Sequence, residues 1–148
     1  MGRNSRISLA LLLIAVTAWY VFYPSDKKRI KKVIDNSTQA IIKKDIDQLM
    51  DHVSFNYRDE YGGTYLLFKK RMEGVFARFE DIEIDADIMG VNVDNDQADA
   101  RLRMSAVVTE GTERGYIIGD GGSDEDVKVY LEKSPYEWKV FKVERTKK

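Results

Sequence analysis

The sequence predicts an α+β domain that follows a short apolar N-terminal segment. Two observations carry this prediction. In the first half of the domain, apolar residues recur at helical spacing, whereas in the second half apolar and polar residues alternate, which is typical of half-buried strands. A run of helices followed by a run of strands indicates an antiparallel sheet with helices packed on one face. The length of 148 residues suits one such domain.

The composition excludes several classes of function. The chain has 24 basic and 25 acidic residues and no cysteine. Because the charge is balanced and no basic stripe is present, we expect no nucleic-acid partner. A chain without cysteine has no disulfides, no thiol catalysis and no cysteine zinc site. The single histidine, His52, cannot form a histidine-rich metal site, so we expect neither a metal nor another cofactor.

The N-terminal segment, residues 1–25, is expected to attach the protein to a membrane. Its uncharged run begins at Ile7 and ends at Tyr23. As a helix this run would reach roughly 25 Å, near the lower limit for a membrane span. An uncleaved anchor and a signal peptide cleaved after Ala18 both fit. The aromatic residues that come after Ala18 favour the anchor, because such residues gather at membrane interfaces.

Flanking charges bear on the side of the membrane that the domain occupies. Arg3 and Arg6 precede the apolar run, and a lysine-rich stretch, residues 27–32, comes after it. Positive-inside counting alone would place the domain in the cytoplasm. However, those lysines are expected to belong to the first helix of the domain, and N-terminal anchors of this kind more commonly export the domain that they carry. We therefore expect the domain on the exported, periplasmic or extracytoplasmic side.

Three helices are expected at the start of the domain, which comprises residues 26–148. Capping residues mark their starts at Ser25, Asp45 and Thr64. The first helix carries lysines opposite an apolar face, and the third carries a wide apolar stripe. Residues 54–63 break the helical pattern between the second and third helices and are expected to form a loop or a short strand.

The second half of the domain predicts a mostly antiparallel sheet of four to six strands. Alternating segments cover residues 82–88, 98–108 and 127–131, and the last strand begins near Trp138. Residues 94–96 (Asp-Asn-Asp) signal a turn between the first two strands.

Three segments resemble the NTF2-like (nuclear transport factor 2-like, or SnoaL-like) superfamily. They are residues 40–50, the loop at residues 57–62, and residues 136–140 (YEWKV) in the last strand. The resemblance covers about residues 26–145. It implies a cone in which three N-terminal helices pack on a curved sheet and enclose a pocket. Because this fold hosts isomerases, dehydratases, ligand binders and scaffolds, the function has to be argued from the site.

Asp59 is the main candidate for catalysis. Its place just before a loop glycine resembles the general-base aspartate of ketosteroid isomerase, which implies proton abstraction next to a carbonyl. The donors that would stabilise the enolate have no match in this sequence. The alternative is a structural carboxylate that caps the third helix or pairs with Arg58. His52 and Tyr57 are further candidates. His52 could act beside Asp59 in a dehydratase-like role, or it could lie at a helix end and interact with the helix dipole.

The pocket predicted by the resemblance is apolar and aromatic. Three tyrosines cluster near its expected mouth, where hydroxyl groups and rings would contact an apolar ligand. Packing in the core and at the rim is the alternative role. The pocket candidates are Tyr57, Asp59, Tyr61, Tyr65, Phe68, Met72 and Trp138.

Three functions remain open on the sequence. The first is a membrane-anchored, non-catalytic domain that binds a small apolar ligand or a protein partner. The second is a structural scaffold of an envelope complex, since the bitopic scaffold proteins of type IV secretion systems share the plan of one span and an NTF2-like domain. The third is an isomerase or dehydratase that uses Asp59. We expect the first, with a homodimer formed through the outer sheet face around Asp99, Arg101 and Arg103.

Overall fold

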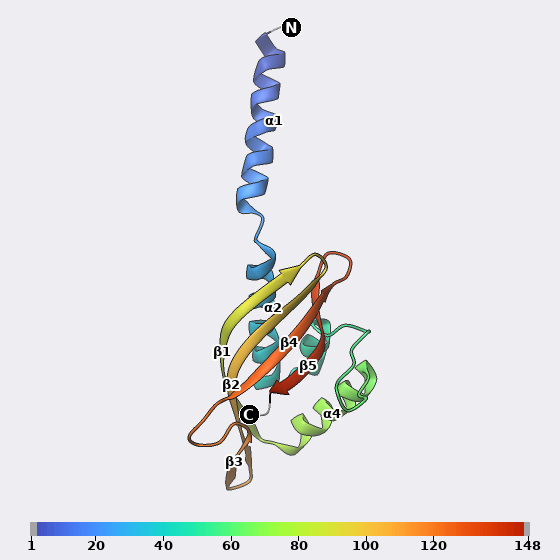
Figure 1. Cartoon of the computed structure of the whole chain (residues 1–148), viewed down its shortest axis with the longest axis vertical. Coiled ribbons are helices and arrows are strands. Elements are labelled where there is room, and N and C mark those ends of the chain that lie inside the picture. Colours follow the sequence, from blue (N-terminus) through green and yellow to red (C-terminus); the bar gives the residue numbers. More distant parts are fainter. Residues whose placement is uncertain (1–2, 147–148) are drawn as a thin grey trace.

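The computed structural model describes residues 3–146, and the side chains from residue 7 onward. Arg3 and Arg6, the predicted N-terminal flank of the apolar run, therefore lie outside the described side chains. Within this part of the chain the structure has four helices and one five-stranded antiparallel sheet (Figure 1). The predicted α+β class is confirmed.

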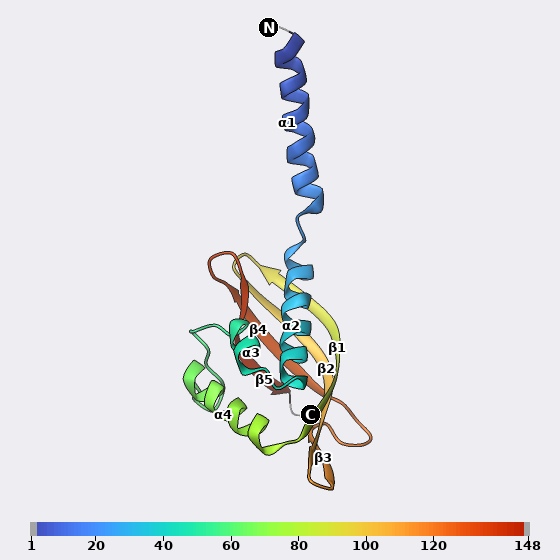
Figure 2. The same cartoon turned by 180° about the vertical axis from the view of Figure 1, so that it is seen from behind.

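Helix α1 (Arg3–Phe22) projects from one end of the domain and has no packing partner along most of its length (Figures 1 and 2). Its large apolar side chains are exposed, including Trp19 and Phe22. Within residues 3–146, no single helix is both long and apolar enough to cross a membrane. One bent pair, Ile7–Phe22 with Asp26–Ile42 at 45°, has the length and composition of a span.

Three more helices precede the sheet, each with the capping residue that the sequence predicts. Asp45, for example, accepts a hydrogen bond from the backbone N–H of Gln48 at 3.0 Å, which satisfies a donor that has no partner within the helix. Ser25 and Thr64 cap the other two helices in the same way, over 3.4 Å each. The helices are α2 (Asp26–Ile42), α3 (Ile46–Asp51) and α4 (Tyr65–Arg78).

The sheet has the strand order β1-β2-β4-β5, and β3 pairs with the far part of β2. The β1–β2 turn lies at the predicted Asp-Asn-Asp, where Asn95 adopts a positive φ of 54°. Register shifts interrupt β1 before Gly90 and β4 after Tyr130, and such bulges bend and twist strands. The strands are β1 (Asp81–Asp94), β2 (Gln97–Glu110), β3 (Glu113–Ile118), β4 (Glu125–Lys133) and β5 (Trp138–Thr146).

Helix α2 lies across the concave face of the sheet, as Figure 2 shows. Ile30 and Ile34 on α2 are buried in one apolar cluster with Leu102 of β2 and Leu131 of β4. Helix α4 differs, because it has no buried residue and lies beside the sheet rather than on it. A cavity lies between α4 and the concave face, and it contains the candidate site.

Candidate functional site

A cavity of about 450 Å³ lies between α2, α4 and the concave face of the sheet. Its walls are mostly apolar, because the inward positions of the alternating strands carry aliphatic residues. Examples from different elements are Ile34, Phe68, Met72, Leu102, Met104 and Val129.

Tyr57 is the most buried polar side chain of the cavity wall, with 3% of its surface exposed. Its ring packs on Phe68 of α4 at 4.8 Å between centroids. The loop that carries Tyr57 is fixed to β5, since the backbone N–H groups of Ser54 and Arg58 donate to the carbonyl oxygens of Val140 and Phe141 at 2.8 and 2.9 Å.

The hydroxyl of Tyr57 has no hydrogen-bond partner among the described residues, and it is not sealed inside protein atoms. Burial, followed by the negative charge of Asp59, raises the pKa of Tyr57 to about 12. The hydroxyl therefore keeps its proton at neutral pH and is free to donate a hydrogen bond into the cavity.

Asp59 also lines this cavity, but both oxygens of its carboxylate already accept hydrogen bonds from within the chain. Oδ1 accepts hydrogen bonds from the backbone N–H groups of Tyr61 and Gly63, at 2.9 and 2.6 Å. Oδ2 accepts from the guanidinium of Arg71 on α4 at 2.9 Å. The predicted pairing with Arg58 is wrong, because Arg58 donates to the carbonyl oxygen of Tyr57 instead. The N-cap of α4 is Thr64, so Asp59 does not cap that helix.

His52 lies away from this cavity, at the C-cap of α3. It lines a second, more polar cleft of about 640 Å³ with Arg29, Asp51 and Trp138. Burial lowers the pKa of His52, which favours the neutral imidazole. The structure thus does not bring His52 and Asp59 together around one cavity.

The remaining pocket candidates divide between the cavity and the packing around it. Tyr61, Phe68 and Met72 line the cavity together with Tyr57 and Asp59. Tyr65 instead packs on Phe55, with ring centroids 4.7 Å apart. The ring of Trp138 is buried, and its indole Nε1–H donates to Asp26 Oδ1 at 2.9 Å.

Two arginines at the cavity were missed at the sequence level. Arg71 is the partner of Asp59, and Arg145 pairs with Glu125 at 2.7 Å. Arg145 lies two positions after Val143 on β5. Because side chains alternate along a strand, it faces the cavity as Val143 does, and the sequence could have predicted this.

The outer face of the sheet carries charged residues, several of which pair within the chain. Arg103 lies 3.6 Å from Asp126, and Lys128 lies 3.6 Å from Asp99. Among residues 3–146 no group of three or more acidic or histidine side chains is placed to hold a metal ion.

Comparison with known proteins identifies the fold. No protein-family model and no curated protein matches the sequence. The chain is similar to a candidate scytalone dehydratase from Novosphingobium aromaticivorans (TM-score 0.69, 14% identity, covering 82% of this chain and 85% of the other). It is also similar to an NTF2-like protein with a cystatin-like fold from the same organism (TM-score 0.63, 14% identity, 97% and 90%).

A third similar structure is Bd1075 of Bdellovibrio bacteriovorus, with a TM-score of 0.64 and 13% identity. The match covers 80% of this chain but only 39% of Bd1075. At such low identities the likeness concerns the fold and not the activity. These structural neighbours support the resemblance seen in the sequence: the domain after α1 has the NTF2-like fold.

Proposed function

We propose that the domain binds a small, mainly apolar ligand that presents one hydrogen-bond acceptor to Tyr57, and that α1 holds the domain at a membrane. The observation that carries the ligand proposal is the free hydroxyl of Tyr57 inside an apolar cavity. A polar group in such surroundings gains a hydrogen bond when a ligand with a carbonyl, ether or hydroxyl oxygen enters. The apolar walls supply the rest of the affinity.

The dimensions of the cavity suit this role. Its volume of about 450 Å³ falls within the range of small-molecule sites, about 300–1,000 Å³. Helix α4 has no buried residue and forms one wall of this cavity.

Dehydration or isomerisation at the cavity is the second candidate function. It is favoured by one observation, the presence of Asp59 and Tyr57 around the same cavity. Against it stands the geometry of the Asp59 carboxylate. Its oxygens already accept hydrogen bonds from Tyr61 N, Gly63 N and Arg71, so they are held by the loop and by α4. The similarity to a candidate dehydratase concerns the fold and leaves the choice to experiment.

A scaffold role receives less support from the surface. A scaffold that assembles through the outer sheet face needs an exposed apolar patch there. The residues that we expected at such an interface, Asp99 and Arg103, are charged and have partners within the chain.

The decisive experiment is native mass spectrometry of the full chain, purified in detergent from its own host. We expect the protein to retain a small molecule, and α1 to remain attached. The variant Ala86→Phe fills the cavity from β1 and is expected to lose the molecule. If the unmodified chain carries no ligand and a panel of apolar ketones and alcohols gives no thermal stabilisation, the ligand proposal is wrong. Loss of α1 in the mature protein would remove the membrane proposal alone.

A further inference from the structure

The end of the domain next to α1 carries a dense group of positive charges. We call Lys27, Lys28, Lys31 and Lys32 the basic collar. All four side chains are exposed on the first turns of α2. None of them forms an ion pair within residues 3–146. Their charge is therefore available to a partner outside the chain.

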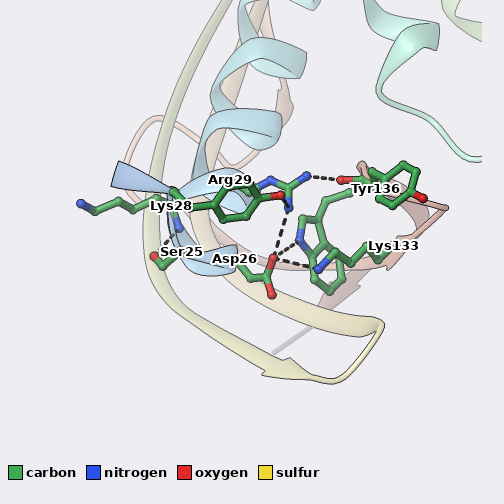
Figure 3. A network of polar contacts seen from close by, with 8 residues as sticks. Ser25, Asp26, Lys28, Arg29, Lys133 and Tyr136 are labelled. Carbon is green, nitrogen blue, oxygen red and sulfur yellow. Dashed lines mark hydrogen bonds and ion pairs between the residues drawn. The ribbon is translucent and has the colours of Figure 1, made fainter. Parts of the chain in front are cut away.

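A polar network fixes the β4–β5 turn beside the basic collar (Figure 3). Asp26 Oδ1 accepts from the Trp138 indole at 2.9 Å and from Lys133 Nζ at 3.3 Å. Arg29 donates to the backbone carbonyl oxygen of Tyr136 and lies 3.5 Å from the carboxylate of Asp26. Lys28 points away from this network in Figure 3. The network thus uses Asp26 and Arg29 and leaves the collar lysines free.

Exposed aromatic side chains lie on the β4–β5 turn at this end of the domain and on the adjoining end of α1. Tyr136 on the β4–β5 turn is 77% exposed, and Tyr20 and Phe22 near the end of α1 are each 83% exposed. Tyr23 accepts a hydrogen bond from Arg29 at 3.3 Å, which joins the junction after α1 to the network. Aromatic residues of this kind favour the boundary between headgroups and acyl chains.

Some negative charge is present here as well. Asp94 and Asp96 lie in the β1–β2 turn, which is joined to the β4–β5 turn by a 2.9 Å hydrogen bond from Lys133 N to the Asp96 carbonyl oxygen. Glu137 pairs with Lys139 at 3.9 Å. These carboxylates are on the turns, whereas the collar lies on α2 directly after the exposed apolar α1. The positive charge is thus next to the segment that enters the membrane in our proposal.

We infer that the basic collar binds the headgroups of anionic phospholipids, so that this end of the domain rests on a negatively charged bilayer. The inference rests on the proposed attachment through α1. The collar supplies the electrostatic attraction, and each lysine near an anionic surface raises local affinity about fivefold. Tyr136 enters the interfacial region, and the Asp26 network keeps its turn level with the collar. The domain is thereby held in one orientation on the membrane.

The test uses the full chain in lipid nanodiscs and exploits the absence of native cysteine. The variant Ser134→Cys places a fluorophore on the β4–β5 turn, and Thr112→Cys places one on the β2–β3 turn at the opposite end of the domain. Contact with lipid is measured as quenching by spin-labelled lipid. We expect quenching at position 134 to rise several-fold when about a third of the lipid is phosphatidylglycerol instead of phosphatidylcholine. Quenching at position 112 should stay low.

Charge variants then assign the effect to the collar. Changing Lys27, Lys28, Lys31 and Lys32 to Gln should remove the rise at position 134. A matched variant that changes Lys43, Lys69, Lys70 and Arg101 to Gln removes the same charge elsewhere and should keep the rise.

Three outcomes would overturn the inference. Equal quenching at position 134 in both lipids would show that the collar does not recognise anionic headgroups, while attachment through α1 would stand. An equal loss in the matched variant would show that only overall charge matters. A chain that associates with neither kind of disc would remove the attachment and the inference together, and would leave the ligand cavity unaffected.

Discussion

Asp59 and Arg71 form an ion pair of 2.9 Å that joins the loop after α3 to the middle of α4. On its other side the same loop is hydrogen-bonded to β5 through Arg58 N and the Phe141 carbonyl oxygen. Because α4 has no buried residue, its position over the cavity depends on contacts such as this ion pair, the ring contact between Tyr57 and Phe68, and the ion pair of Arg78 with Glu110 at 3.1 Å. The carboxylate that resembles a catalytic base therefore acts in this structure as a tether.

The tether predicts a specific response to Asp59→Asn. The amide keeps an oxygen that accepts from Tyr61 N and Gly63 N but loses the ion pair with Arg71. Because the guanidinium of Arg71 is 47% exposed, we expect a loss of only about 1 kcal/mol in unfolding free energy. Ligand retention in native mass spectrometry should persist. Arg71→Gln should cost a similar amount, and the two losses should not add in the double variant.

A catalytic Asp59 would behave differently. Asp59→Asn would then abolish turnover of a hydroxylated or ketonic substrate, in addition to its effect on stability. Such a loss of turnover would favour the dehydratase or isomerase function over the binding function.

Gly63 lies tightly against the tether. A Cβ at position 63 would stand 2.2 Å from Asp59 Oδ2 and 2.9 Å from a guanidinium nitrogen of Arg71. Gly63→Ala must therefore displace the carboxylate from its donors, and we expect it to cost about 2–4 kcal/mol of unfolding free energy in urea titrations.

Gly62→Ala is the matched control, because the space around that position is open and its φ of +75° is the only obstacle. We expect it to cost about 1 kcal/mol. Similar losses for the two variants would show that the Asp59 network contributes little to stability.

The sequence predicts the local features of this domain well, because their determinants lie within a few residues. The three N-caps Ser25, Asp45 and Thr64 each bond to a backbone N–H three residues further along. The alternation of apolar residues likewise identifies the inward face of each strand without knowledge of the sheet order.

The partners of the site residues could not be predicted in the same way. Arg58 is adjacent to Asp59 in sequence, yet the partner is Arg71, which the turn of α4 brings back over the loop. Trp138 bonds to Asp26, 112 positions earlier. Such pairs depend on how helices and strands pack. In addition, this chain has many arginines and carboxylates that could form an equivalent ion pair, so the sequence does not identify which ones do.

Tyr57→Phe tests the free hydroxyl. The hydroxyl has no partner to lose, so we expect unfolding free energy at neutral pH to stay within about 0.5 kcal/mol of the unmodified protein. Affinity for an apolar ketone should fall about tenfold, whereas affinity for a hydrocarbon of similar size should not change. Isothermal titration calorimetry with such a matched pair of ligands provides the measurement. Equal losses for both ligands would mean that the ring, and not the hydroxyl, determines binding.

The raised pKa of Tyr57 also predicts how the stability of the unmodified protein and of Tyr57→Phe should differ at alkaline pH. The pKa is raised from 10.0 to about 12 in the folded state, so the neutral phenol stabilises the fold fully below pH 10. That contribution is lost as the pH rises from 10 towards 12. Tyr57→Phe has no such group, and its stability should fall less over this interval. Parallel curves for the two proteins would show that the tyrosine titrates normally and is accessible to water.

The carboxyl of Asp26 predicts how the stability of the protein changes at acidic pH. The hydrogen bond from Trp138, together with the contacts to Lys133 and Arg29, lowers the pKa of this carboxyl below its usual value of 3.8. A lowered pKa stabilises the folded state above the unfolded value, and this stabilisation is lost as the pH falls through the folded pKa. At neutral pH, Asp26→Asn keeps an oxygen for the indole and loses the attraction to both cations, so we expect a loss of about 1 kcal/mol.

The difference between the Asp26→Asn variant and the unmodified protein should therefore shrink between about pH 5 and about pH 3, as followed by urea unfolding at each pH. Asp35→Asn is the control, since Asp35 is an exposed carboxylate on the same helix. A constant difference across this interval would mean that the indole and the two cations do not act through the charge of Asp26. The junction between α1 and the domain would then be held by packing of the Trp138 ring, and the network in Figure 3 would not be what keeps the β4–β5 turn beside the basic collar.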